Sequence, residues 1–284
     1  MKNQECIHSL LSYIEDHLYE PLTIEELAKQ MGYSSYHLHK LFTGAFEMSI
    51  HTYIVRRRLS EAAYFLVQSD MSIIEIALQA GYESQQAFHK AFKGLYHKTP
   101  ASYRKKGSGF KVQMPLTLSN PTTLSTSYEI DVVELGALKF AGFQGDCAKG
   151  FQVIRKCHHN LHKYKDNIRT RVNTDFYVGI NDYTNANFDT TQPSFLYFTG
   201  IQIQEELQNS MFYIKDIPAS RYLRFRFYAN PKDSMEPIAY AIYHEYLPYT
   251  TYCCSEHCPM DIIFYEEVHG KEKEVEISYL VGID

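Results

Sequence analysis

Apolar side chains recur at intervals of three and four positions through the amino-terminal part of the chain, which is the period of helices with one buried face. The pattern predicts a first helix over residues 3–18, a second after Thr23, a third after Ser34 and a long fourth over residues 49–68. Thr23 is followed three residues later by Glu26, which is the sequence of a capping box at a helix start. This part of the chain is therefore predicted to be entirely helical.

Two stretches of this helical part are copies of each other. Residues 23–33 match residues 72–82 at an offset of 49 positions, and the match then continues at an offset of 50. Each copy has the pattern helix, Gly-containing turn, helix, which is that of a helix-turn-helix. Self-similarity over this length indicates a duplicated supersecondary unit, so two equivalent second helices are expected.

The second helix of each copy combines an apolar face with a polar one. The outward polar positions are Ser35, Tyr36, His39, Lys40 and Thr43 in the first copy, and Gln85, Gln86, His89, Lys90 and Lys93 in the second. Side chains of these kinds read base edges in the major groove, since Gln pairs with adenine and Lys with guanine. We expect both helices to contact DNA, and the alternative is a polar face that is merely solvated.

Positive charge is concentrated where DNA contact would require it. Residues 84–106 hold six Lys/Arg and no Asp/Glu, although residues 1–107 balance 12 Lys/Arg against 11 Asp/Glu and the whole chain has a formal net charge of −5. Arg104 in this stretch and Arg56 in the Arg56-Arg57-Arg58 cluster of the central helix are predicted to serve phosphate contact and packing. The central helix is expected to hold the two reading helices about one DNA turn, roughly 34 Å, apart.

A change of composition marks the end of this part. Residues 107–127 contain 12 Gly, Ser, Thr or Pro and a single charge, which is typical of a linker, and an alternating pattern over residues 110–118 predicts an edge strand within it. We therefore expect a DNA-binding domain over residues 1–107, a linker over residues 108–127 and a second domain over residues 128–284.

Strand and helix patterns alternate in the second domain and repeat once. Strands are predicted over residues 128–145, 175–183, 195–205, 212–228, 260–267 and 274–281, with helices over residues 151–168 and 235–247. Two strand-helix-strand-strand units would form an antiparallel sheet with helices on one side and a concave face with a central cleft. The predicted fold is an all-α domain followed by an α+β domain.

The amino-terminal motifs resemble a known family. Residues 77–94 and 99–104, together with the duplicated turn, are similar to the DNA-binding domain of AraC-family transcription regulators, a unit of about seven helices. Ile50 stands where the family usually has a Pro, whereas Pro100 keeps it in the second copy. The resemblance implies base and backbone contacts for Tyr36, His39, Lys40, Gln85, Gln86 and Lys90.

The second domain resembles the GyrI-like small-molecule-binding domain, which occurs fused to AraC-type DNA-binding units. The likeness is carried by residues 217–227, 243–248, 262–266 and 274–281. This sequence departs from the family's usual residues at Tyr246, Ile263 and Leu280. The resemblance implies an effector pocket, whose chemistry transfers only loosely.

Alternation along the last predicted strand separates two faces. Val275, Ile277, Tyr279 and Val281 are expected to pack under the helices, so that Glu276 points to the cleft. A carboxylate among aromatic side chains favours a cationic or aromatic ligand. The other pocket candidates are Phe225, Tyr240, Tyr243 and Tyr265. The alternatives are that Glu276 is solvated at an edge and that these aromatic residues are plain core.

Other chemistry is disfavoured by the spacing of the residues that would perform it. His158 and His162 lie four apart beside Cys157, and a second group consists of Cys253, Cys254, His257 and Cys258, but these spacings fit no established zinc site. Neither a G-x-S-x-G motif nor a phosphate-binding loop is present. No metal or cofactor is expected, and the six irregularly spaced Cys are expected to be reduced thiols.

Apolar runs stay short of the roughly 18 residues that cross a bilayer, so a cytoplasmic protein at the bacterial nucleoid is expected. The sequence thus predicts a ligand-responsive transcription regulator, whether activator or repressor, and not an enzyme. The predicted partners are promoter double-stranded DNA, a small-molecule effector and RNA polymerase, with no membrane partner, for a monomer or a homodimer. The alternative is a small-molecule hydrolase or drug-sequestering protein tethered to DNA.

Overall fold

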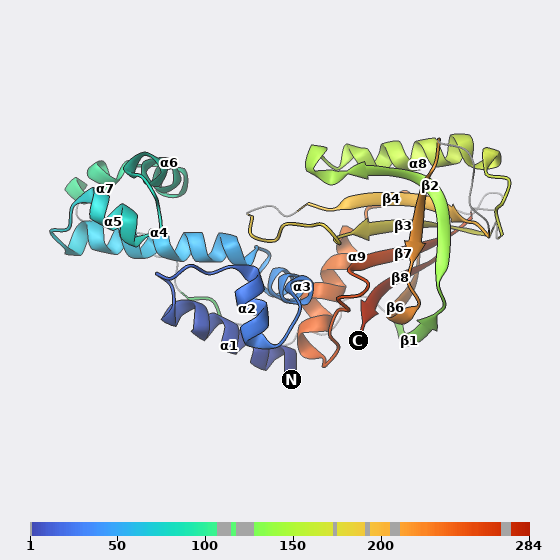
Figure 1. The fold of residues 1–284 in the computed structure, drawn as a ribbon, viewed down its shortest axis with the longest axis horizontal. Coiled ribbons are helices and arrows are strands. Elements are labelled where there is room, and N and C mark those ends of the chain that lie inside the picture. The colour runs from blue at the N-terminus through green and yellow to red at the C-terminus, as the bar shows by residue number, and fades with distance from the viewer. Residues whose placement is uncertain are drawn as a thin grey trace. The chain divides into compact units, whose positions relative to one another are not determined.

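A computed structural model of the chain describes residues 2–106, 115–117, 128–172, 175–190, 194–204, 211–267 and 274–284, in two compact units (Figure 1). The first unit comprises Met1–Pro121, Phe188–Thr191 and Pro248–Thr250, and the second comprises Thr122–Asn187, Gln192–Leu247 and Thr251–Asp284. Most of the predicted linker, and nearly all of the edge strand predicted over residues 110–118, lie outside the described residues. The predicted domain boundaries therefore stay predictions.

Seven α-helices form the first unit within the described residues, as the resemblance to the AraC-type DNA-binding domain implied. They are α1 (Lys2–Asp16), α2 (Ile24–Met31), α3 (Ser35–Phe46), α4 (Ile50–Gln68), α5 (Ile73–Gln79), α6 (Gln85–Tyr96) and α7 (Pro100–Lys106). The duplication is visible in the helix starts, because Thr23 and Glu26 form a capping box at α2 and Ser72 and Glu75 form the same box at α5. The second helices of the two copies, α3 and α6, have 12 residues each.

The long helix α4 connects the two copies. Helices α5, α6 and α7 gather around one end of it, and α3 packs against its other end (Figure 1). The core of the second copy joins Leu59 and Leu66 of α4 to Ile76, Phe88 and Phe92. With 19 residues, α4 is about 28 Å long at 1.5 Å per residue, which is of the order of one DNA turn.

An ionic cluster around the buried Arg57, with two partly exposed carboxylates, fastens α1 to α4. The Arg57 guanidinium donates to Glu15 at 2.8 Å and to Glu61 at 3.0 Å, while the Tyr53 hydroxyl donates to Glu15 at 2.6 Å. Burial acts to raise the pKa of Glu15, but the hydrogen bonds from Arg57 and Tyr53 outweigh it and hold that pKa below its ordinary value. Arg58 donates to the carbonyls of Leu18 and Glu20. The Arg cluster was expected to serve phosphate contact and packing. Arg57 and Arg58 serve packing, because their guanidinium groups bond to groups within this unit.

Within the described residues, the second unit contains eight strands and, besides short 3₁₀ turns, two helical segments. The strands are β1 (Glu129–Leu135), β2 (Leu138–Asp146), β3 (Phe176–Asp182), β4 (Leu196–Gln202), β5 (Tyr213–Ile217), β6 (Ser220–Ala229), β7 (Met260–Glu266) and β8 (Val275–Ile283). The helical segments are α8 (Gln152–Tyr164) and α9 (Glu236–Tyr240), which continues into the π-helix η3 (Ala241–Tyr246). The strands form one antiparallel sheet in the order β1-β6-β8-β7-β3-β4-β2-β5.

The prediction of one long strand at the start of each repeat was wrong. Residues 128–145 contain β1 and β2, and residues 212–228 contain β5 and most of β6. Because β1 pairs with β6 and β5 pairs with β2, the chain has to turn between the members of each pair. It does so at Gly136 and at Pro218, which cannot donate a ladder hydrogen bond. Each half therefore has two strands before its helix and two after it, and the first strand of each half pairs with a strand of the other half.

Both helical segments contact the same face of the sheet. His158 of α8 hydrogen-bonds the Tyr197 hydroxyl of β4, and Tyr243 of η3 donates to Asp261 of β7. Strand registers place these two strand residues on one side of the sheet. The prediction of helices on one side is confirmed. The opposite face carries a buried apolar cluster that includes Phe140, Val178, Phe198, Ile262 and Leu280.

Candidate DNA-binding and effector-binding sites

Helix α6 presents its polar face as the sequence predicted. Gln85, Gln86, Lys90 and Lys93 are exposed, whereas Phe88 and Phe92 are fully buried on the inner side. Ser84 caps the helix by accepting from the Ala87 N–H. Two amide and two ammonium side chains thus stand on one accessible helix face, and their reading of DNA bases stays a prediction.

Helix α3 differs from its copy, and the expectation that its reading face is exposed was wrong. Tyr36, His39 and Lys40 are only 4%, 7% and 8% exposed. For His39 the physical reason is Phe188, far along the chain, whose ring stacks on it with centroids 4.4 Å apart and lies 6.4 Å from the Tyr36 ring. Burial, with a smaller contribution from the neighbouring charge of Lys40, lowers the pKa of His39 to about 3. Ser35 and Thr43 are half-buried.

The two predicted phosphate contacts outside the reading helices differ in their surroundings. The Arg104 guanidinium donates to the carbonyls of Leu66 and Met71, at 3.0 and 2.6 Å, so it holds α7 against the end of α4. Arg56 is half-buried on α4. A structural role for Arg104 is therefore visible, and a role in DNA contact stays a prediction for both residues.

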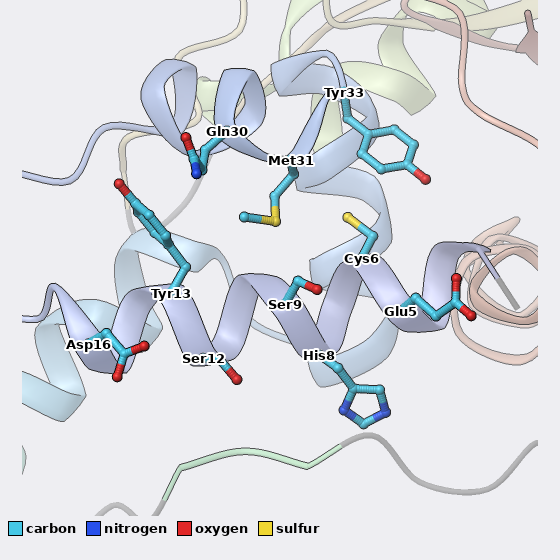
Figure 2. Close-up of a pocket in the computed structure, with 10 residues that line it drawn as sticks. All are labelled: Glu5, Cys6, His8, Ser9, Ser12, Tyr13, Asp16, Gln30, Met31 and Tyr33. Atoms are coloured by element: carbon cyan, nitrogen blue, oxygen red, sulfur yellow. The ribbon is translucent and has the colours of Figure 1, made fainter.

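A polar groove of about 760 Å³ lies between α1 and α2 in the first unit (Figure 2). Its lining includes Glu5, His8, Tyr13, Asp16 and Gln30, with no Lys or Arg among its residues. Two carboxylates without a cation repel a phosphate backbone. This groove is accordingly not a candidate for DNA contact.

A buried carboxylate lies on the helix-covered face of the second unit. Asp261 is 1% exposed, and it accepts hydrogen bonds from the hydroxyls of Tyr243 and Tyr279. Burial, followed by the charge of Asp261, raises the pKa of Tyr279 well above its ordinary value. Asp261 was missed by the sequence reading because it stands in an otherwise apolar strand segment, where only its alternation with Ile263 and Tyr265 marks its face.

A group of aromatic side chains lies on the same face, under α8. Tyr177 and Tyr265 stack with their ring centroids 5.0 Å apart and their planes at 12°. His158 approaches Tyr265 edge-on and its Nε2 lies 2.7 Å from the Tyr197 hydroxyl. Gly179 lies beneath them, since a Cβ there would collide with the Tyr197 hydroxyl and press on the Tyr265 ring. The missing side chain lets these rings come together.

The effector residues predicted from the sequence do not all meet. Tyr243 and Tyr265 belong to the surroundings of Asp261 and of the stacked tyrosines, and Phe225 is buried on the same face, edge-on to Tyr246. Tyr240 is 41% exposed, and its ring is tilted by 34° against the ring of His244 at 4.4 Å. Glu276 pairs with Tyr228 on the opposite face of the sheet, where its charge acts on Arg224. Glu276 therefore lies on the face that the helices do not cover, and its part in effector binding stays a prediction.

Metal ligands do not gather within the described residues: they contain no group of three or more His, Cys, Asp or Glu arranged to hold an ion. The six cysteines are thiols that are not joined in disulfide bonds. Among the helices of the described ranges, none is both long and apolar enough to cross a membrane.

Acid is expected to destabilise the second unit through His158. Burial, followed by the charge of His162, lowers the pKa of His158 to about 4, so the folded state keeps the imidazole neutral while the unfolded state protonates it near its ordinary value of 6.5. The stabilising contribution is present above pH 6.5 and is lost as the pH falls toward 4, by at most about 1.4 kcal/mol per pH unit. Urea unfolding at several pH values should show a shallower pH slope for His158→Gln than for the exposed His159→Gln. Equal slopes for the two variants would contradict this role.

The comparisons with known proteins concern mainly the first unit. A helix-turn-helix domain model matches residues 27–106. The regulatory protein SoxS of Escherichia coli (strain K12) is 36% identical over 104 residues, which is 37% of this chain and 97% of that protein. The transcriptional regulator Rob of Salmonella typhimurium is 40% identical over 124 residues, or 43% of each chain. The solved structure of SAV2435 bound to tetraphenylphosphonium covers 56% of this chain and 94% of that one, at 9% identity and a TM-score of 0.42.

Two helix-turn-helices joined by one long helix are the architecture of a DNA-binding protein. The chain belongs to the AraC family of helix-turn-helix transcription regulators, a class of regulators and not of enzymes. The match spans less than half of the length of the Rob regulator. What the second unit binds, and which partners the whole protein has, are therefore matters of proposal.

Proposed function

We propose that the second unit binds a small effector that is both cationic and aromatic, and that this binding changes promoter occupancy by the first unit. The observation that carries the proposal is the buried Asp261 carboxylate, held by the hydroxyls of Tyr243 and Tyr279 on the helix-covered face. A promoter-binding regulator with such a site would respond to the ligand through its different affinities for two states.

The chemistry of the surrounding residues supports a cation. A buried carboxylate is costly unless it is paired or hydrogen-bonded, and a ligand cation would supply further compensation. Tyrosine rings attract cations over their faces, and Tyr177 and Tyr265 supply stacked rings on the same side of the sheet. An effector with a delocalised positive charge and aromatic groups would match both features.

Asp261 and Glu276 are two carboxylates on opposite faces of the sheet. Substituting each in turn therefore shows which of them binds the ligand cation. Asp261 is favoured, because it lies with Tyr243 and Tyr279 on the helix-covered face. Glu276 remains the alternative ligand residue, and its neighbour in charge is Arg224, which would oppose a cation.

Ligand binding is best tested on the full chain with tetraphenylphosphonium and with triphenylphosphine oxide, a neutral molecule of similar aromatic character. We expect the cation to raise the melting temperature saturably, and Asp261→Asn to weaken its binding about tenfold or more, equivalent to about 1.4 kcal/mol. Glu276→Gln should bind as the unaltered chain does. Tyr279→Phe, which keeps the carboxylate, reports whether the site still folds.

Equal binding of the neutral compound, or weakening by Glu276→Gln and not by Asp261→Asn, would overturn the assignment to Asp261. Product formation from the bound compound would favour the hydrolase alternative. We also propose that the protein contacts RNA polymerase at the promoter and that it is a monomer or a homodimer. Sedimentation of the chain with and without promoter DNA measures this oligomeric state.

A further inference from the structure

The two copies of the helix-turn-helix are in different states in this molecule. His39 and Lys40 of α3 are buried. Their counterparts on α6 are more accessible, since His89 is half-buried and Lys90 is exposed. Helices α3 and α6 share a Ser N-cap, a length of 12 residues and the His-Lys pair. The difference therefore does not come from the motif itself but from what lies against α3.

A short segment of the first unit, residues 188–190, supplies the cover. The Phe188 ring stacks on His39 with centroids 4.4 Å apart and planes at 30°, and it lies against Tyr36 at 6.4 Å. Phe188 is itself only 7% exposed. An aromatic ring stacked on base-reading side chains occupies the position that a base edge would take in the major groove.

Two hydrogen bonds fix the same segment at the ends of neighbouring helices. Asp189 Oδ1 accepts from the Ile24 N–H at the first turn of α2, at 2.9 Å. The Ser49 hydroxyl, which caps α4, donates to the Thr190 carbonyl at 2.9 Å. A carboxylate at a helix N-terminus makes the contact that a DNA phosphate makes in helix-turn-helix complexes.

We propose that residues 188–190 form an internal mimic of DNA that masks the first reading helix, with Phe188 in place of a base and Asp189 in place of a phosphate. The proposal rests on the DNA-reading function of α3. DNA can engage α3 only after the segment leaves, so the masked chain binds through α6 and the unmasked chain through both helices. The segment continues on both sides toward strands β3 and β4, which carry Tyr177 and Tyr197 of the aromatic group.

The test is a cycle of four full-length chains: unaltered, Phe188→Ala, His39→Ala and the double variant. The probe is a duplex selected for binding to the Phe188→Ala chain from a random-sequence library. Removing Phe188 is expected to tighten the Kd about tenfold. His39→Ala should change the Kd little in the unaltered chain, because His39 is masked, and about tenfold in the Phe188→Ala chain. Phe151→Ala, which removes an exposed Phe of the second unit, is the matched control and should leave the Kd unchanged.

A second measurement does not depend on DNA. Titration of the His39 imidazole by NMR should give a pKa of about 3 in the unaltered chain and a value near the ordinary 6.5 in Phe188→Ala. Asp189→Ala, which removes the side-chain bond to Ile24, should move the His39 pKa in the same direction. Circular dichroism shows whether each variant keeps its helices.

The outcomes separate the mask from the function on which it rests. Equal DNA affinity of the unaltered and Phe188→Ala chains, with the same cost of His39→Ala in both, would overturn the mask while leaving DNA binding intact. An unchanged His39 titration in Phe188→Ala would overturn it as well. If no chain, including Phe188→Ala, binds any selected duplex, this result would instead contradict the DNA-reading function of these helices.

Discussion

Replacing Gln85, Gln86 and Lys90 together by Ala is expected to weaken specific DNA binding by at least about 100-fold, because each lost base contact costs about 1–3 kcal/mol. All three side chains are exposed on α6, the reading helix that is accessible in this structure. The salt dependence of the Kd should also become less steep, by about one in the log–log slope if Lys90 contacts a phosphate. Fluorescence anisotropy at several salt concentrations measures both quantities.

The matched control for this triple variant is Lys149→Ala, an exposed lysine of the second unit. It should leave both the Kd and its salt slope unchanged. Because the substituted residues of α6 are exposed, the triple variant is expected to melt at the temperature of the unaltered chain. Binding within threefold of the unaltered chain would show that α6 does not read DNA.

Arg57→Ala is expected to lower the free energy of unfolding of the first unit by about 3 kcal/mol or more, the range found when one partner of a buried ion pair is removed. The Arg57 side chain is only 6% exposed, and its loss leaves Glu15 and Glu61 facing each other without their shared cation. Urea unfolding followed by the helical circular dichroism signal measures the effect, because this unit contains most of the helices.

Arg57 has a built-in control in its neighbour Arg56, which is half-buried on the same helix. Arg56→Ala should cost less than about 1 kcal/mol, as is usual for partly exposed positions. The double variant Glu15→Leu with Arg57→Met, which removes both charges of the buried pair, should recover part of the loss. Equal destabilisation by Arg56→Ala and Arg57→Ala would contradict a structural role for the cluster.

The helical part could be predicted from the sequence because its signals are local. A capping box such as Thr23 with Glu26, the copy of it at Ser72 and the helical period of apolar residues each act within a few positions. The strands were harder to delimit. Whether β1 continues into β2 depends on β1 pairing with β6, roughly 90 residues away, and no local pattern carries that information.

The candidate sites also divide into features set by the local sequence and features set by distant contacts. The accessible face of α6 followed from its own period, but the burial of His39 depends on Phe188, which lies 149 positions further along the chain. Asp261 was overlooked for a related reason: its two hydroxyl partners, Tyr243 and Tyr279, come from a π-helix and from another strand. Contacts of this range are set by tertiary packing, which composition and periodicity do not encode.

Hydroxyl-radical footprinting of the Phe188→Ala chain on its selected duplex tests most directly whether α3 and α6 read one DNA segment together. Two protected patches about 10 base pairs apart on the same face of the duplex are expected, one lost in Lys90→Ala and the other in His39→Ala. A single protected patch, or two patches that neither substitution removes, would contradict the claim that α3 and α6 read one DNA segment together.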